Sequence, residues 1–362
     1  MSARKDRRLR GVAVAAAALA LTAVAACGGA ESTGATATGG SGGPAEVRLG
    51  YFPNITHATA LVGTEKGLFA KHLGAGTTLK TSTFNAGPAA IEAVFSGAID
   101  ATYVGPNPAI NAWAKSKGEA IKIIAGAASG GVFLVVKPEI KSVADLKGKK
   151  IATPQLGNTQ DVALRHWLDS QGVKTDTKGG GEVSIVPQEN SQTIQTFATG
   201  DIDGAWVPEP FASRLITESG GKVLIDERDL WPDKQFVITH LIVRQEFAKE
   251  HPETVKKLVE AHVEANALIE SDPAGAAQTA NAALEKLTGK PLKPEVLDAA
   301  FKNITFTNDP IASSLVGSAD HAVKVGLLEP VDLDGIYDLK ILNEVLAARG
   351  RPPSPTSRGD LR

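Results

Sequence analysis

The 362-residue chain is poor in cysteine and in aromatic residues, and it has no marked excess of charge of either sign. Cys27 is the only cysteine, so an internal disulfide is excluded and a buried core must stabilise the fold. The chain has 38 Lys and Arg against 40 Asp and Glu, without a basic stripe. This balance gives no indication of nucleic-acid binding.

The common catalytic motifs are also missing. The chain has no Gly-x-Ser-x-Gly nucleophile elbow, no phosphate loop ending in Gly-Lys-Ser/Thr and no His-Glu-x-x-His motif. The seven histidines show no metal-ligand spacing, so we predict no metal and no cofactor. A carboxylate pair needs no local motif, and an exported hydrolase with such a pair remains an alternative. The sequence favours binding over catalysis.

The N-terminus has the pattern of a secretion signal. Basic residues at positions 4–10 precede an apolar run over 12–26, which is shorter than the roughly 20 residues of a membrane-spanning helix. The run ends in Val-Ala-Ala before Cys27, which resembles the lipobox of bacterial lipoproteins. We therefore predict a signal peptide over 1–26, lipidation of Cys27 and a location at the outer face of the cytoplasmic membrane. An ordinary cleavage site with an incidental cysteine is the alternative.

Two further segments contain few apolar side chains that could be buried in a core. Residues 27–45 are rich in Gly, Ser, Thr and Ala, which predicts a flexible tether, and 352–362 form a polar tail. Without the presequence, which has five basic residues and Asp6, the net charge is −6. The remaining 300 or so residues are many for one core and suit two lobes. We expect a monomer.

One pattern occurs twice in the chain. Residues 94–104 contain Gly97 and Asp100, and residues 197–207 contain Gly200 and Asp203, each 103 positions later. Each copy indicates a helix that ends at glycine, followed by a short apolar strand. A spacing near 100 residues is typical of lobes rather than solenoid repeats, and ligands bind in clefts between lobes.

Strands and helices alternate twice along the chain, which predicts an α/β protein with mainly parallel strands. The first series has strands at 47–51, 77–84, 101–104, 121–125 and 133–136, and the second has strands at 151–153, 183–187, 205–207 and 223–225. The C-terminal third, 252–350, is predicted to be mostly helical, with Pro252 and Pro273 at helix starts. The simplest topology is a discontinuous lobe one over 46–136 plus 243–351, and a lobe two over 137–242, joined by hinge crossovers.

Candidate ligand residues lie where strands lead into helices, because exposed N–H groups at helix starts attract anions. One such junction contains Asn85 and Gly87, and another contains Gln155, Asn158, Thr159 and Gln160, with Asp161 as a capping partner. Simple helix capping without a ligand is the alternative at both. Further candidates follow the other strands: Asn54, Thr56, His57, Pro106, Asn107, Trp206 and Glu209. Trp206 could equally be a core residue.

Five segments together resemble the substrate-binding proteins of ABC importers for sulfonate, taurine and nitrate. They are residues 50–52, 65–69, 85–88, 142–152 and 205–211, and the resemblance covers 46–351. It implies a type II periplasmic-binding-protein fold with a hinge. It also implies ligand contacts from the loop after the first strand and from the helix starts near Asn85 and Asn158.

The resemblance leaves the solute open. It implies capture of an aliphatic sulfonate, a taurine-like solute or a related small oxyanion, and delivery to an ABC permease with its ATPase. Sulfonate-binding relatives often have Gly-Ser where this chain has Gly157-Asn158. The same superfamily includes binders of thiamine-precursor pyrimidines, so a heteroaromatic solute stacked on Tyr51, Trp113 or Trp206 is the alternative.

Overall fold

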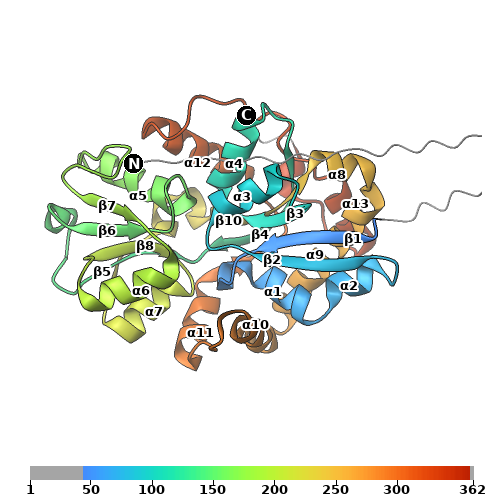
Figure 1. Cartoon of the computed structure of the whole chain (residues 1–362), viewed down its shortest axis with the longest axis horizontal. Coiled ribbons are helices and arrows are strands. Elements are labelled where there is room, and N and C mark those ends of the chain that lie inside the picture. Colours follow the sequence, from blue (N-terminus) through green and yellow to red (C-terminus); the bar gives the residue numbers. More distant parts are fainter. Residues whose placement is uncertain (1–43, 359–362) are drawn as a thin grey trace, which may run out of the picture. The chain divides into compact units, whose positions relative to one another are not determined.

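The strands form two mixed sheets in the computed structural model, which describes residues 44–358 (Figure 1). The larger sheet has the order β11-β4-β10-β3-β1-β2, and the smaller has β7-β6-β8-β5-β9. The larger sheet consists of β1 (Glu46–Tyr51), β2 (Thr78–Thr83), β3 (Ala101–Val104), β4 (Ile121–Gly130), β10 (Val237–Arg244) and β11 (Ile304–Phe306). The smaller consists of β5 (Val132–Val136), β6 (Lys150–Thr153), β7 (Ser184–Pro187), β8 (Gly204–Pro208) and β9 (Lys222–Asp226). The predicted signal peptide and Cys27 lie outside the described residues.

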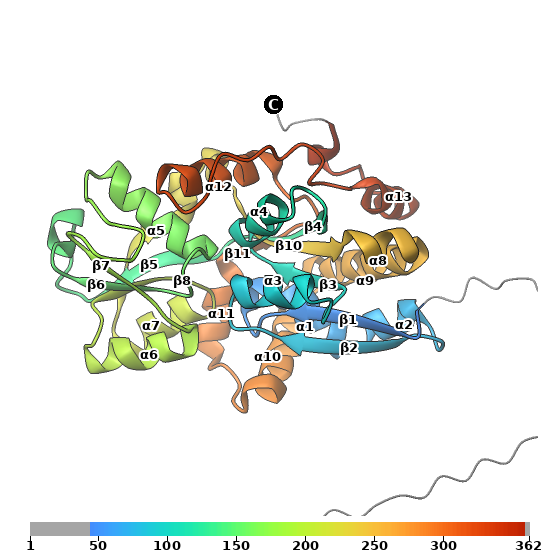
Figure 2. The ribbon, with the colours of Figure 1, turned by 45° about the horizontal axis from the view of Figure 1, so that its top comes forward.

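Helices cover both faces of each sheet. Lobe one, built on the larger sheet, has α1 (Ala58–Glu65), α2 (Leu68–Leu73), α3 (Gly87–Phe95), α4 (Pro106–Lys115), α8 (Gln245–Glu250), α9 (Pro252–Ser271), α10 (Pro273–Thr288), α11 (Pro294–Lys302), α12 (Ala312–Lys324) and α13 (Lys340–Ala348). Lobe two has α5 (Thr159–Ser170), α6 (Asn190–Thr199) and α7 (Phe211–Ser219). Figures 1 and 2 show α5 on one face of the smaller sheet and α6 and α7 on the other.

The repeat noted in the sequence is structural. In each lobe the first strand lies between two parallel neighbours, β2 and β3 around β1 and β7 and β8 around β6. The repeated aspartates make the same contact: Asp100 Oδ2 accepts from the backbone N–H of Arg48, and Asp203 Oδ2 from that of Lys150, both at 2.9 Å. Each aspartate therefore fixes the register of the strand that follows it against the first strand of its lobe.

The observed crossovers differ from the predicted lobe boundaries. Residues 133–136 were expected in lobe one, but they form β5, which pairs with β8 and β9 in the smaller sheet. Residues 237–242 were expected in lobe two, but they belong to β10, between β3 and β4 in the larger sheet. The chain crosses at Gly130-Gly131 and again between β9 and β10, through the 3₁₀ turns η3 (Glu227–Leu230) and η4 (Pro232–Lys234). Buried apolar strands look alike in sequence, so only sheet pairing decides which lobe receives them.

Pro106 and Asn107, which were predicted to follow a strand, lie in the first turn of helix α4, which begins at Pro106. Proline suits the first helical turn because its missing N–H has no partner there in any case. The C-terminal third is largely helical, and α9 and α10 begin at Pro252 and Pro273 as expected, although the short strand β11 was not foreseen. In the predicted polar tail, Ser354 is buried and the Thr356 N–H donates to Asp309 Oδ1 at 3.1 Å.

Burial explains this layered arrangement. Strands β3, β5 and β8 are buried along their whole length, as expected for strands with a helix layer on each face. On α9, an apolar stripe is buried in the main core; it consists of Val255, Leu258, Val259 and Val263. Among the described residues, no helix is long and apolar enough to cross a membrane.

Candidate functional site

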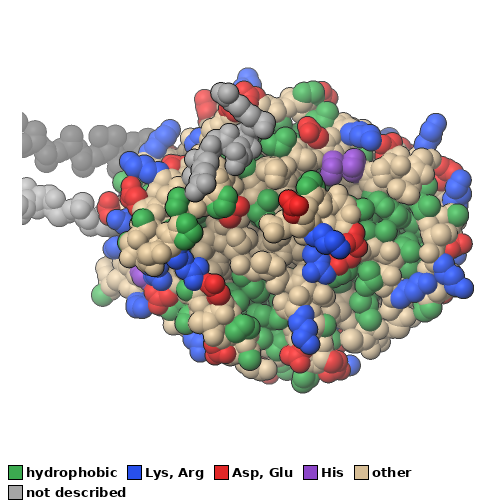
Figure 3. Space-filling model, turned by 180° about the vertical axis from the view of Figure 1, so that it is seen from behind, with side chains coloured by type: hydrophobic (Ala, Val, Ile, Leu, Met, Phe, Trp, Pro, Cys, Tyr) green, Lys and Arg blue, Asp and Glu red, His purple; other side chains and the backbone are tan. Residues whose placement is uncertain are grey.

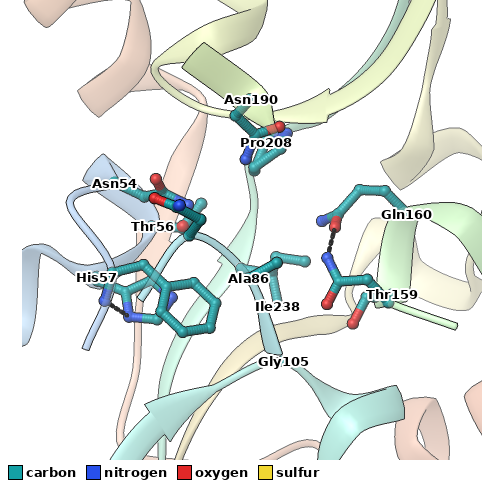
Figure 4. A pocket seen from close by; sticks show the side chains of 13 residues that line it. Asn54, Thr56, His57, Ala86, Gly105, Thr159, Gln160, Asn190, Pro208 and Ile238 are labelled. Atoms are coloured by element: carbon teal, nitrogen blue, oxygen red, sulfur yellow. Dashed lines mark hydrogen bonds between the residues drawn. The ribbon is translucent and has the colours of Figure 1, made fainter. Parts of the chain in front are cut away.

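A hollow lies between the two sheets, and both lobes contribute to its wall (Figure 4). It holds about 320 Å³ of space free of protein atoms, part of it open to solvent. The lining residues are Phe52, Asn54, Thr56, His57, Asn85, Ala86, Gly105, Asn158, Thr159, Gln160, Asn190, Pro208 and Ile238.

Four helices begin at the wall of this hollow, two from each lobe. Ala86, Gly105 and Asn158 directly precede α3, α4 and α5, and Asn190 is the first residue of α6. A helix start offers free backbone N–H groups and the positive end of the helix dipole. Helix α4 contributes fewer N–H donors than the others, because Pro106 and Pro108 lack this group.

The loop after β1 supplies the neutral histidine of the site. His57 lies in the 3₁₀ turn η1 (Ile55–His57), and its Nδ1 accepts a hydrogen bond from the Phe52 N–H at 3.2 Å. The ring also stacks on Phe52, with centroids 4.3 Å apart. Complete burial lowers the pKa of His57 to about 3, so the ring is neutral near pH 7. Because Nδ1 accepts, the proton is on Nε2, which is left as a donor.

The start of α5 is anchored by a buried ion pair. Asp161 accepts from the Gly157 N–H at 2.9 Å, from Thr153 Oγ1 at 2.9 Å and from Arg165 Nε at 3.0 Å. Asp161 and Arg165 are both buried. The carboxylate thus ties strand β6, the following loop and the second turn of α5 together, and this fixes the backbone of Asn158.

Two polar atoms of the wall have no partner. Thr159 Oγ1 and Asn190 Oδ1 are buried, yet neither makes a hydrogen bond with the protein. Buried polar groups are nearly always hydrogen-bonded, so unsatisfied ones in a hollow indicate a place for a ligand or water. Nearby, Asn158 Nδ2 donates to Gln160 Oε1 at 2.9 Å. In Figure 4, Thr159 and Gln160 face Asn54 and His57 across the hollow.

The lining contains neither Lys nor Arg, and no Asp or Glu. Beside the lining, Glu189 Oε1 accepts a hydrogen bond from Asn85 Nδ2 at 2.8 Å. This bond joins lobe one to lobe two beside the hollow. Among residues 44–358 no three His, Cys, Asp or Glu side chains are grouped as a metal site would require. On the face in Figure 3, basic and acidic side chains are interspersed rather than gathered by sign.

Seven of the predicted ligand residues line the hollow: Asn54, Thr56, His57, Asn85, Asn158, Thr159 and Gln160. Gly87 lies next to it, because a Cβ there would come within 3.0 Å of Asn158 Oδ1. Six further residues line the hollow without having been predicted as ligand contacts: Phe52, Ala86, Gly105, Asn190, Pro208 and Ile238. Asn190 could have been predicted, since it follows a strand end as the other candidates do. Ile238 lines the hollow because β10 belongs to the larger sheet, which was not predicted.

The remaining predicted residues lie outside the lining. Asn107 Nδ2 donates to the Ser318 carbonyl at 3.0 Å on α12, and Pro106 is in the first turn of α4. Trp206 is fully buried, and its Nε1 donates to Glu227 at 2.6 Å, so it is a core residue. Gln155 is also absent from the lining.

Glu209, the last of these candidates, is buried away from the hollow. It accepts from Ser213 Oγ at 2.8 Å and from Asn303 Nδ2 at 2.7 Å. Burial raises the pKa of Glu209, and these bonds oppose the shift. Because Asn303 belongs to lobe one, the Glu209 carboxyl links the lobes near the crossover instead of facing a solute.

Known proteins resemble this chain in sequence and in fold. The model of the NMT1-like family matches residues 40–284. A Brucella abortus (strain 2308) protein whose name describes it only as a binding protein is 32% identical over 306 residues, which is 80% of this chain and 89% of its own. The taurine-binding periplasmic protein of Escherichia coli (strain K12) is 32% identical over 209 residues, 57% of this chain and 61% of its own.

Solved structures agree with this picture. The alkanesulfonate-binding protein SsuA of Xanthomonas axonopodis pv. citri, bound to MOPS, has a TM-score of 0.67 at 21% identity, covering 80% of this chain and 96% of its own. At this identity the likeness shows the fold alone, which is the periplasmic-binding-protein fold that the sequence predicted. Nitrate-binding proteins also occur among the similar sequences. These relatives are named for binding and not for catalysis, as predicted.

Proposed function

The chain belongs to the NMT1-like family and is a solute-binding protein of the ABC-importer type, and we propose that its solute is an aliphatic sulfonate, such as taurine, or a related small oxyanion. The observation that carries the proposal is the meeting of four helix starts, two from each lobe, at one hollow. An anion there gains from N–H donors and helix dipoles, each dipole contributing about 0.3–1 kcal/mol and up to about 2 kcal/mol when partly buried.

Closure follows from the same geometry. A solute held by the starts of α3 and α5 contacts both lobes only when they are close together. Contacts of this kind shift the population towards the closed form. The closed form is what a permease and its ATPase would recognise, so binding of the solute is the signal for delivery.

The first experiment measures melting temperatures of the purified protein with taurine, a longer alkanesulfonate, nitrate and a sulfate ester. A ligand at 100 times its Kd stabilises the folded state by about 2.7 kcal/mol. We expect a clear rise with at least one of these solutes, and unchanged melting across all of them would refute the proposal.

Asn190→Ala tests whether this hollow is the site. Removing this side-chain amide should weaken the solute about tenfold. When the amide is turned about its last torsion, Nδ2 can donate to an oxyanion, and such a hydrogen bond is worth about 0.5–1.5 kcal/mol, or more with a charged partner. The matched control is Gln192→Ala, an exposed residue on the same helix. Equal affinity of both variants, measured by calorimetry, would place the solute elsewhere.

A second candidate is a heteroaromatic solute, such as a thiamine-precursor pyrimidine. The specific observation in its favour is the stacked Phe52–His57 pair in an uncharged, amide-rich wall. Amides offer both donors and acceptors, which suit a ring edge, and an aromatic face can stack on the ring. Stabilisation by an aminopyrimidine, with none from the sulfonates and nitrate, would select this candidate.

We further propose that lipid on Cys27 holds the protein at the outer face of the cytoplasmic membrane. The supporting pattern is the short apolar run with small residues before a single cysteine. The native chain should partition into detergent, and Cys27→Ser should release it into the aqueous phase. Partitioning that does not change on substitution would refute lipidation.

A further inference from the structure

A second crevice lies away from the solute hollow and shares none of its lining residues. It is bounded by α5 of lobe two, by η3 in the crossover and by α12 of the C-terminal third. It holds about 480 Å³ of space free of protein atoms, part of it open to solvent. Six of its lining residues matter here: His166, Trp167, Ser170, Glu227, Trp231 and His321.

Aromatic rings form a continuous column along this crevice. Trp231 stacks on Phe236 with centroids 5.6 Å apart, and the His321 ring lies 5.1 Å from Trp231, tilted by 42°. His321 stacks on His166 at 3.6 Å and an interplanar angle of 11°. The column therefore runs from the crossover through α12 to α5, and its rings, with Trp167, give the crevice an aromatic wall.

The crevice also has a buried carboxyl group that the proposed function does not use. Glu227 is 2% exposed, and it accepts hydrogen bonds from Trp206 Nε1 at 2.6 Å and from Trp231 Nε1 at 3.4 Å. Within residues 44–358, no Lys, Arg or His forms an ion pair with it. Burial raises the pKa of Glu227 to about 7, because no positive charge offsets the loss of hydration.

Nearby basic groups do not supply the missing charge. Burial lowers the pKa of His321 to about 4, and it also lowers the pKa of His166, so both rings are neutral near pH 7. Lys324 on α12 pairs with Asp169 on α5 at 3.2 Å. The crevice thus combines aromatic faces with an uncompensated acid.

Strained backbone borders the same region. An adjoining hollow shares Trp231 and His321 with the crevice, and its wall includes Asp233 and Ile311. Their φ angles are 50° and 49°, in the left-handed region that β-branched residues such as isoleucine rarely adopt. Strain of this kind persists where surrounding structure enforces it, often at functional sites.

We propose that this crevice is a second small-molecule site, for a quaternary ammonium compound. Aromatic faces attract such cations, and the Glu227 carboxylate would neutralise the charge. Both Glu227 oxygens already accept an indole N–H. A cation without N–H donors fits this acid better than a guanidinium, which has five donors to satisfy. The proposal concerns a site separate from the solute hollow and does not depend on what that hollow binds.

The test titrates the full chain with choline and, in parallel, with its neutral isostere 3,3-dimethyl-1-butanol, by calorimetry and tryptophan fluorescence. We expect saturable choline binding and at least tenfold weaker binding of the isostere. Glu227→Gln, which keeps the shape and an acceptor for the indole N–H, should weaken choline at least tenfold. Asp229→Asn, a change at an exposed acid in the same turn, should leave it unchanged.

Ser170→Trp provides a second, independent variant. Ser170 is exposed at the end of α5 and lines the crevice, so a large side chain there should block entry without removing a core contact. We expect choline binding to be lost while the melting temperature stays near that of the native chain. Equal binding of choline and the isostere, unchanged affinity in Glu227→Gln, or no saturation at millimolar choline would each overturn the proposal.

Discussion

At the residue scale, the ionisable side chains at the site either stay neutral, as His57 does, or are paired, as Asp161 and Arg165 are. Asp161 and Arg165 are buried together, and the aspartate holds the Gly157 N–H as well. Removing one partner of such a pair leaves an uncompensated buried charge, whereas replacing both partners is often tolerated. The pair therefore positions the start of α5. Removing one partner or both partners separates this role from the contribution of the pair to stability.

Asp161→Ala should destabilise the protein by about 3–5 kcal/mol, because Arg165 then lacks its counter-ion. Urea denaturation measures this loss. The control is Asp161→Leu combined with Arg165→Met, which removes both charges and should recover much of the stability. A loss below about 1 kcal/mol in the single variant would contradict a buried ion pair, since that is the range of exposed pairs.

His57 should remain neutral across the physiological range, because burial lowers its pKa to about 3. The imidazole resonances of His57 should therefore not shift between pH 5 and 8 in an NMR titration. Over the same pH range, the solute affinity should not change through His57, because this ring does not change its charge there. A His57 titration midpoint near 6.5 would contradict a buried, neutral ring at the site.

At the element scale, two glycines let helices from opposite lobes approach each other. Gly105 precedes α4, and a Cβ there would meet Thr159 Oγ1 of α5 at 2.5 Å. Its φ of −72° is open to any residue, so the requirement is for space and not for a special backbone conformation. Gly87 at the start of α3 is equally crowded, by Pro108 and by Asn158.

Gly105→Ala should hinder closure of the lobes and weaken solute binding about tenfold, or about 1.4 kcal/mol. The melting temperature of the solute-free protein should change little, because the clash arises between lobes and each lobe keeps its core. Calorimetry and thermal melting together separate the two effects. Adding Thr159→Ala removes the Oγ1 that the new methyl group would meet, and failure to restore any affinity would argue against the clash.

At the scale of the whole molecule, buried histidines predict sensitivity to acid. Burial lowers the pKa of His240 and His262 to about 4, from an ordinary value of 6.5. The unfolded chain takes up these protons at higher pH than the folded chain, so stability falls as pH drops through this window. At pH 5 the loss is on the order of 2 kcal/mol for each histidine.

Denaturation at pH 7.5 and pH 5 checks this expectation. His262→Gln should lose less stability on acidification than the native chain does. Glu227 acts in the opposite sense: its raised pKa means that stability falls as pH rises from 4.5 towards 7. Glu227→Gln should therefore steepen the acid loss. A pH response that neither variant alters would show that other groups control it.

The two crossovers between the lobes have backbone and side-chain features that bear on movement of the lobes. Gly130 and Gly131 have φ angles of 78° and 70°, and the Glu209 N–H donates to the Gly131 carbonyl at 2.8 Å. Consecutive glycines in the left-handed region allow the chain to leave β4 and enter β5 without strain. The second crossover contains Trp231, so an occupant of the second crevice would lie beside a segment that must adjust when the lobes move.

The amino-acid sequence alone predicted the α/β alternation, the lobe repeat and several helix starts, because these depend on local patterns of apolar residues, prolines and glycines. It also predicted seven of the lining residues, since strand ends that lead into helices are visible as local motifs. The placement of β5 and β10, the core position of Trp206 and the roles of Gly105 and Ile238 were decided only by the tertiary structure. Strand pairing and contacts between lobes join residues far apart in the chain, and no local pattern encodes such partners.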